Sequence, residues 1–290
     1  MNSAPHLQGE VLPPSPGSSP GSLPDYAAEQ AEGRARQTHA AAFAPRRRSR
    51  LSSTPATYIL LGINIAVFLL MVLRGVSPSS PTPNQLIYFG ANATDLVLAG
   101  QWYRLLTATF VHVGIIHLAT NMWCLYNLGL LGEPLLGKWG LIATYLITGI
   151  AGNLLSLGVN VLLIIVTRTP NFSVGAGASG AVFGIAGILI VLLSNKKLPI
   201  PLPELGRLRR SVIQFAGLNL VIGLATVIVP LVRIDNMAHI GGFLSGLALG
   251  PALVPRMTSG RRLYLARQKI TFSVAAFCLL LFAYWIAKLR

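Results

Sequence analysis

The stretch VGAGASGAVFGIAGILIVLL, residues 174–193, decides the fold of this chain. Its first eleven residues contain four glycines and the serine Ser179, and the next nine are apolar apart from one glycine. From Ser179 the apolar helix continues for about 17 residues, or about 25 Å, which is several ångströms less than a hydrocarbon core of about 30 Å. Ser179 is therefore expected below the membrane surface. The glycine-rich segment before it is expected to line a wet pocket, since irregular backbone at that depth must be buried in protein or border water.

Other apolar runs recur along the chain. Hydrophobic residues make up 53% of its 290 residues and charged residues only 11%, whereas about 25% of the residues of a soluble domain are charged. The mean hydropathy is +0.62. This composition predicts an all-α polytopic membrane protein with seven runs near or above bilayer length. The runs are 58–73, 105–131, 141–166, 179–193, 212–231, 237–253 and 271–287.

The basic residues indicate how the chain is oriented. With the cluster Arg46, Arg47, Arg48 and Arg50 placed in the cytoplasm and seven alternating spans, 17 of the 23 Lys and Arg residues fall on the cytoplasmic side. This bias predicts a cytoplasmic amino terminus and an external carboxyl terminus. The net charge of +15 is thus explained by basic residues that orient the chain in the membrane. Because no basic face with interleaved aromatic residues is present, nucleic acid is not expected as a partner.

Residues 1–50 are rich in Pro, Ser and Gly and have no apolar periodicity, which predicts a disordered cytoplasmic segment. No apolar region typical of a signal peptide occurs there, and the acidic residues Glu10, Asp25, Glu29 and Glu32 argue against a transit peptide. We therefore expect a multi-pass protein of a bacterial plasma membrane, with an organelle membrane as the alternative.

Acidic and sulfur-containing residues exclude several function classes. After residue 50 the only carboxylates are Asp95, Glu133, Glu204 and Asp235, all in predicted loops or at span ends. Ion-coupled carriers usually hold an ionisable group near the midplane, so a transporter or channel is the less favoured alternative. The two cysteines lie inside apolar runs, which predicts neither a disulfide nor a metal site.

A small set of polar residues inside the predicted spans remains: His112, His117, Asn121, Ser179 and His239. Polar side chains at membrane depth are costly and often functional, although hydrogen bonding between helices is the other explanation. A serine nucleophile needs a base, and His239 is the best candidate. Its helix carries small residues at four-residue spacing, Gly242 and Gly246, and the helix of Ser179 carries Gly180 and Gly184, so the two helices are expected to approach closely.

Two further polar residues share one face of the second span, because His117 and Asn121 are four residues apart. Both side chains can donate hydrogen bonds to a developing oxyanion. His112 lies five residues before His117 and is a less certain member of this set. Since no third acid is evident, we expect a Ser-His dyad rather than a triad.

At this point the sequence resembles the rhomboid intramembrane serine proteases, over about residues 98–255. Four signatures occur in order: Gln101-Trp102-Tyr103-Arg104, His112 with His117-x-x-x-Asn121, Gly177-Ala178-Ser179-Gly180, and Ala238-His239-Ile240-Gly241-Gly242. The resemblance implies that Ser179 is the nucleophile, His239 the base, and Asn121 and His117 oxyanion donors. It also implies supporting roles for Gly177, Gly180, Phe183, His112, Gly242, Gly246 and Arg104. Phe183 stands where some members have a tyrosine, and Tyr103 is inserted between Trp102 and Arg104.

The resemblance further implies a six-span protease domain, residues 55–255, followed by residues 256–290 as a basic cytoplasmic loop and a seventh helix. It implies cleavage of peptide bonds in or near the transmembrane segments of single-span membrane proteins, without a metal or organic cofactor. The alternative within the family is an inactive relative that binds and escorts membrane clients. Since such relatives typically lack the serine or the histidine, this alternative is less favoured. The oligomeric state is not predicted.

Overall fold

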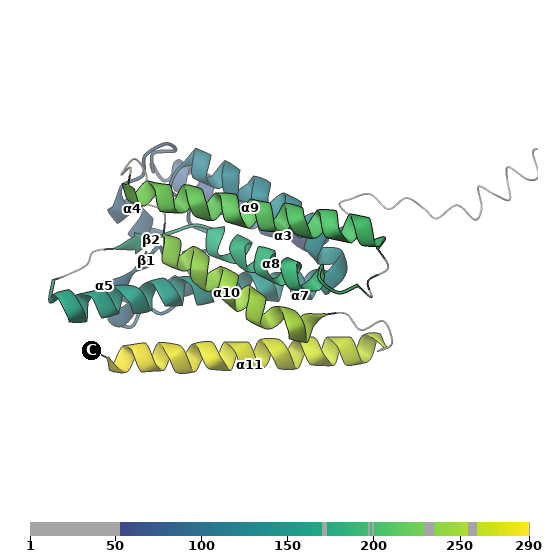
Figure 1. The fold of residues 1–290 in the computed structure, drawn as a ribbon. Coiled ribbons are helices and arrows are strands. Elements are labelled where there is room, and N and C mark those ends of the chain that lie inside the picture. Colours follow the sequence, from purple (N-terminus) through teal and green to yellow (C-terminus); the bar gives the residue numbers. More distant parts are fainter. Residues whose placement is uncertain are drawn as a thin grey trace, which may run out of the picture. The chain divides into compact units, whose positions relative to one another are not determined.

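The structure is a computed structural model that describes residues 53–169, 173–196, 198, 200–228, 235–254 and 260–289, with only the backbone described for 223–228. The predicted disordered segment, 1–50, lies outside these residues. The elements are α3 (Pro55–Leu73), α4 (Pro83–Tyr88), β1 (Asn92–Ala93), α5 (Thr94–Leu98), α6 (Arg104–Thr107), α7 (Ile115–Thr167), β2 (Val174–Gly175), α8 (Ser179–Leu192), α9 (Leu202–Ile228), α10 (Asn236–Leu253) and α11 (Arg261–Lys288) (Figure 1).

Three described helices are both long enough and apolar enough to cross a membrane, namely α3, α7 and α11. α8 is a shorter apolar helix. The predicted membrane-protein class thus agrees with the helices, whereas the count of six core spans and a seventh stays a prediction.

Two of the predicted spans lie in α7, which is one long helix. Gly137 has φ 75° and ψ 164° inside it, and Pro134 lies three residues earlier, so the helix is kinked there. Proline removes a backbone donor and a glycine with positive φ interrupts the helical ladder. The kink therefore separates the predicted spans 105–131 and 141–166.

α8 is the innermost helix of the described chain. Residues 180–189 are all buried, and the apolar core around them is formed by α3, α7, α9 and α10. A helix that is apolar on every side is expected at the centre of a bundle. Ser179 is the first residue of this helix.

Three predicted spans begin at different residues in the structure. The span expected from residue 105 is divided into α6 and α7, because residues 108–114 are not helical and Gly114 has φ 98°. α9 begins at Leu202 rather than 212, and α11 at Arg261 rather than 271. Both helices start with polar and basic turns, which an apolar run does not include, so the segment expected as a basic loop after residue 256 is helical from Arg261.

The four carboxylates that were expected only in loops or at span ends include one with a buried structural role. Glu133 is 3% exposed, and its two oxygens accept the backbone N–H groups of Ala56 at 2.9 Å and Thr57 at 2.8 Å and the Thr57 hydroxyl at 2.8 Å. The N-cap residue of α3 makes no side-chain cap bond of its own. Glu133 therefore caps α3 from α7, which compensates the burial of its charge.

Candidate active site

The site begins at a close crossing of α8 and α10. A Cβ atom placed on Gly242 would overlap the carbonyl oxygen of Gly180, and one on Gly246 would overlap that of Gly184. Only glycine allows two helix backbones to approach this closely. The structure therefore brings the two helices together along the glycine faces that the sequence indicated.

This crossing places the first turns of the two helices face to face. Gly180 follows Ser179, and a Cβ atom on it would lie 3.2 Å from the carbonyl oxygen of Ala238, which precedes His239. One turn after Ser179, the ring of Phe183 stacks on the His239 imidazole with a centroid distance of 4.5 Å and an interplanar angle of 17°. Phe183 thus orients the imidazole over the turn that starts with Ser179.

His239 is 6% exposed, and its Nδ1 atom has no hydrogen-bond partner among the described residues. In a triad, a carboxylate would accept a hydrogen bond from this nitrogen. No such carboxylate contacts it in the described part of the chain. Ser179 is half-buried, so it is partly open to the exterior of the bundle.

Gly177 lies between the serine and a second histidine. A Cβ atom on Gly177 would lie 2.7 Å from His117 Cε1, 3.1 Å from His117 Nε2 and 3.7 Å from Ser179 Oγ. Its φ of 139° is also one that L-residues rarely adopt. A glycine at 177 therefore lets the His117 imidazole and the Ser179 hydroxyl border the same small space.

A hydrogen bond to His117 indicates which of its ring nitrogens carries the proton. The Val113 N–H donates to His117 Nδ1 at 3.3 Å, so in the neutral imidazole the proton is on Nε2. Asn121, one turn later, is 5% exposed and donates one amide hydrogen to the His117 carbonyl at 2.9 Å, which leaves its second amide hydrogen. The two side chains thus provide N–H groups on the face of α7 expected from their spacing.

His112 contacts the residue before Ser179 rather than Ser179 itself. It is fully buried, and its Nδ1 lies 3.2 Å from the Phe110 carbonyl, an acceptor that assigns the proton to Nδ1. Its Nε2 then accepts the N–H of Ala178 at 3.4 Å. The His112 and His117 rings lie 5.4 Å apart. His112 therefore supports the residue just before Ser179.

Similarity to known proteins agrees with this arrangement. A family model, the rhomboid domain, matches residues 99–256. This chain belongs to the rhomboid family. Rhomboid protease AarA of Providencia stuartii is 32% identical over 212 residues, which are 71% of this chain and 75% of AarA. Family and apolar helices together make this rhomboid an integral membrane protein.

Two further relatives show how much of a longer protein the chain covers. Rhomboid protease GluP of Bacillus subtilis (strain 168) is 34% identical over 221 residues, which are 75% of this rhomboid but 39% of GluP. Rhomboid-like protease 2 of Toxoplasma gondii is 30% identical over 199 residues, which are 66% of this rhomboid and 63% of the relative.

Arg104 of this rhomboid organises the loop before α7, and its hydrogen bonds in the described residues go to that region and not to Ser179 or His239. The side chain is 6% exposed. It donates to Gln101 Oε1 at 2.7 Å and to the carbonyl oxygens of Ile87 at 2.7 Å and Ala91 at 3.1 Å. Buried guanidinium groups need such acceptors, so Arg104 holds α4, β1 and α6 together.

Sequence reasoning missed Asp235 and Ser156 near the site. Asp235 is the N-cap residue of α10, four residues before His239, and its carboxylate accepts the Ala238 N–H at 3.0 Å and the Ser156 hydroxyl at 2.7 Å. Aspartate just before a predicted helix is a known N-cap signal, which the sequence contained. Ser156 carried no such signal. No group of three His, Cys, Asp or Glu side chains placed to hold a metal occurs in the described residues.

Proposed function

We propose that this chain is an intramembrane serine endopeptidase that cleaves peptide bonds in or near the transmembrane segments of other membrane proteins. The observation that carries the proposal is the stacking of His239 on Phe183 at 4.5 Å, over the helical turn that begins with the half-buried Ser179. The family membership and the names of the relatives, several of them rhomboid proteases, support it.

In this mechanism Ser179 and His239 form a dyad. The imidazole takes the proton of the Ser179 hydroxyl while Oγ attacks the scissile carbonyl carbon. His239 then gives this proton to the leaving amine as the peptide bond breaks, which leaves an acyl-enzyme. Water, deprotonated by His239, hydrolyses the ester and restores the serine.

His117 and Asn121 stabilise the negative charge of the tetrahedral intermediates. The Nε2–H of His117 borders the same space as Ser179 Oγ, and Asn121 has an uncommitted amide hydrogen one turn along the helix. Fixed donors aimed at a developing oxyanion act strongly where water is excluded. We assign the oxyanion site to these two residues.

The substrates in this proposal are single-span membrane proteins. A stable helix protects its peptide bonds from attack, so the cleaved segment must unwind locally, which favours glycine and other weak helix formers near the cut. We further propose a bacterial plasma membrane with the amino terminus in the cytoplasm. An inactive relative that escorts membrane clients is the second candidate, and the presence of both Ser179 and His239 disfavours it.

A fluorophosphonate probe tests the proposal directly. We expect the purified protein to cleave a single-span model substrate and to be labelled at Ser179, as located by mass spectrometry. Ser179→Ala and His239→Ala are each expected to reduce cleavage to below about one thousandth, and the double variant to add little, because the two groups act as a unit. Ser194→Ala, at the far end of α8, is the matched control and should keep full activity. Cleavage by folded Ser179→Ala would refute the serine mechanism.

A further inference from the structure

We propose that Asp235 is a positioning residue for the reaction: it fixes the first turn of α10, and with it His239, against α7 and against the strand that leads to Ser179. This proposal rests on the proposed function of Ser179 and His239. It assigns to Asp235 no contact with the substrate.

The first observation is the cap on α10. Asp235 Oδ1 accepts the N–H of Ala238 at 3.0 Å, and the Asp235 carbonyl accepts the N–H of His239 at 3.3 Å. The Ala238 N–H belongs to the first turn, whose N–H groups have no partner within the helix, whereas the His239 N–H makes the first regular i→i−4 bond of the helix. The Asp235 side chain therefore holds the N–H of the residue directly before His239.

The second observation links this turn to α7. Asp235 Oδ2 accepts the hydroxyl of Ser156 at 2.7 Å, and Ser156 is 4% exposed. One turn earlier on α7, a Cβ atom on Gly152 would overlap the Ala238 carbonyl oxygen, so the two helices touch there as well. A polar bond and a close backbone contact thus hold the start of α10 on α7.

The third observation links the same carboxylate to the nucleophile's strand. A Cβ atom on Gly175 would lie 2.8 Å from Asp235 Oδ2, so the backbone of β2 passes directly beside this oxygen. Gly175 pairs with Asn92 and lies four residues before Ser179. Asp235 therefore lies beside three segments: α10, which carries His239, α7, and β2, which ends four residues before Ser179.

The surroundings of His239 explain why such positioning matters. Phe183 stacking sets the plane of the imidazole, but Nδ1 has no hydrogen-bond partner among the described residues. Asp235 does not act as a third acid, because its two oxygens bind Ala238 and Ser156. Because no described side chain forms a hydrogen bond with Nδ1, a displacement of the helix start is transmitted to the imidazole, and errors of about 1 Å cost about 100-fold in rate.

The test measures labelling of Ser179 by a fluorophosphonate in the full-length protein. The final extent of labelling reports the folded fraction, whereas the rate constant reports the dyad geometry. For Asp235→Ala we expect a rate constant and a kcat about 10- to 100-fold lower, with KM within about twofold. Asp235→Asn keeps a cap acceptor and a polar group facing Ser156, so it should retain most of the rate. The control is Asp95→Asn, an exposed carboxylate in the first turn of α5.

Two outcomes would overturn the positioning role. In one, Asp235→Ala is labelled at the wild-type rate constant. In the other, only the extent of labelling falls, which would show that the residue stabilises the fold and nothing more. If Asp235→Ala does not fold, Ser156→Ala and Ser156→Thr test the proposal instead, since only Thr keeps the hydroxyl. Equal labelling rate constants for both variants and the wild type would contradict the proposal. A wild-type protein that is not labelled at Ser179 would instead refute the proposed function.

Discussion

At His117, the direction of one hydrogen bond determines which ring nitrogen carries the proton. Because the Val113 N–H occupies Nδ1, the neutral ring presents Nε2–H to the space beside Ser179. His112 has the opposite assignment, since its Nδ1 faces a carbonyl and its Nε2 accepts from Ala178. The two neighbouring histidines thus carry their protons on different ring nitrogens: His117 presents an N–H beside Ser179, whereas both ring nitrogens of His112 bond to the backbone.

Removing the oxyanion donors tests this distinction. Asn121→Ala is expected to lower kcat by about 10- to 1,000-fold with little change in KM, since one donor to the transition state is lost. His117→Ala should have an effect of the same kind. Cleavage assays on both single variants and the double variant measure it. Unchanged rates in all three would show that this face of α7 serves only helix packing.

Among the helices, the α8–α10 crossing is the contact that assembles the site. Small residues at four-residue spacing on both helices remove the side chains that would otherwise keep the backbones apart. Gly180 and Gly184 face Gly242 and Gly246 in this way. The same crossing brings Gly180, next to Ser179, against the Ala238 carbonyl, next to His239, so the proposed dyad depends on the glycines that pack the two helices.

A single added methyl group tests this crossing. In Gly246→Ala the new Cβ would overlap the Gly184 carbonyl oxygen, and we expect a loss of about 1–3 kcal/mol in the free energy of unfolding. Gly217→Ala on α9 is the matched control, because a Cβ there meets nothing within 4 Å. Unfolding in detergent, followed by circular dichroism, measures both. Equal stability of the two variants would contradict the close contact.

α11 is attached at both of its ends by different means. Near its start, Gln268 donates to the Leu136 carbonyl at 2.8 Å, next to the α7 kink, and Tyr264 donates to the Leu135 and Leu253 carbonyls at 3.1 and 3.2 Å. Near its end, Ile286 is fully buried in an apolar cluster that includes residues of α5, α7 and the loop before α7. α11 thus donates hydrogen bonds to two carbonyls of α7 beside its kink.

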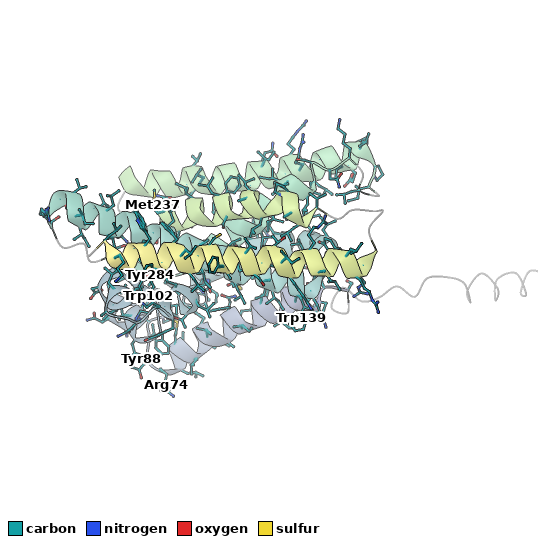
Figure 2. All side chains as sticks on the ribbon, turned by 90° about the horizontal axis from the view of Figure 1, so that it is seen from below. Arg74, Tyr88, Trp102, Trp139, Met237 and Tyr284 are labelled. Carbon is teal, nitrogen blue, oxygen red and sulfur yellow. The ribbon has the colours of Figure 1, made fainter. Side chains whose placement is uncertain are left out.

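Loss of the Gln268 amide tests this attachment. Gln268→Leu leaves the Leu136 carbonyl without this donor, and we expect a decrease of about 1–3 kcal/mol in the free energy of unfolding. The folded fraction should keep its rate of substrate cleavage, because Gln268 contacts Leu136 beside the α7 kink, and Trp139 at that kink lies toward the opposite end of the bundle from Met237 in the first turn of α10 (Figure 2). Lys269→Ala, at the exposed neighbouring position, is the control. A stability equal to that of the control would argue against capping by α11.

At the largest scale, the first turn of α10 and the α7 kink lie toward different ends of the described helices. In Figure 2, Trp102 and Met237 lie toward one end of the bundle and Trp139, beside the α7 kink, toward the other. Tryptophan is enriched at membrane interfaces. Met237 belongs to the first turn of α10, so the proposed site belongs to the end that contains Trp102.

Reporter fusions test the proposed orientation. A reporter joined after Lys196, before α9 begins, should score cytoplasmic, and one joined after Arg290 should score external. The reason is that loops rich in Lys and Arg stay on the cytoplasmic side of the membrane. A protease-protection assay on the same fusions is the independent measurement. Both reporters on one side would refute seven alternating spans.

Much of the fold and of the candidate site follows from the sequence because the causes are local. Apolar runs become helices in a membrane, where each backbone polar group must be satisfied within the chain. The glycine spacing on two helices indicated which faces meet, and four-residue spacing placed His117 and Asn121 together. These patterns are read from neighbouring residues alone.

The tertiary structure decided what depends on partners far along the chain. Glu133 caps α3 across 77 residues, and Asp235 meets Ser156 across 79, so neither role is visible in a local pattern. The start of α7 at Ile115 rather than 105 has the same origin. The non-helical segment before it contributes the Ala108 carbonyl to the Gly177 N–H and the Thr109 carbonyl to the Tyr145 hydroxyl. Hydrogen bonds formed only after the helices have assembled outweigh the helical preference of the apolar run there.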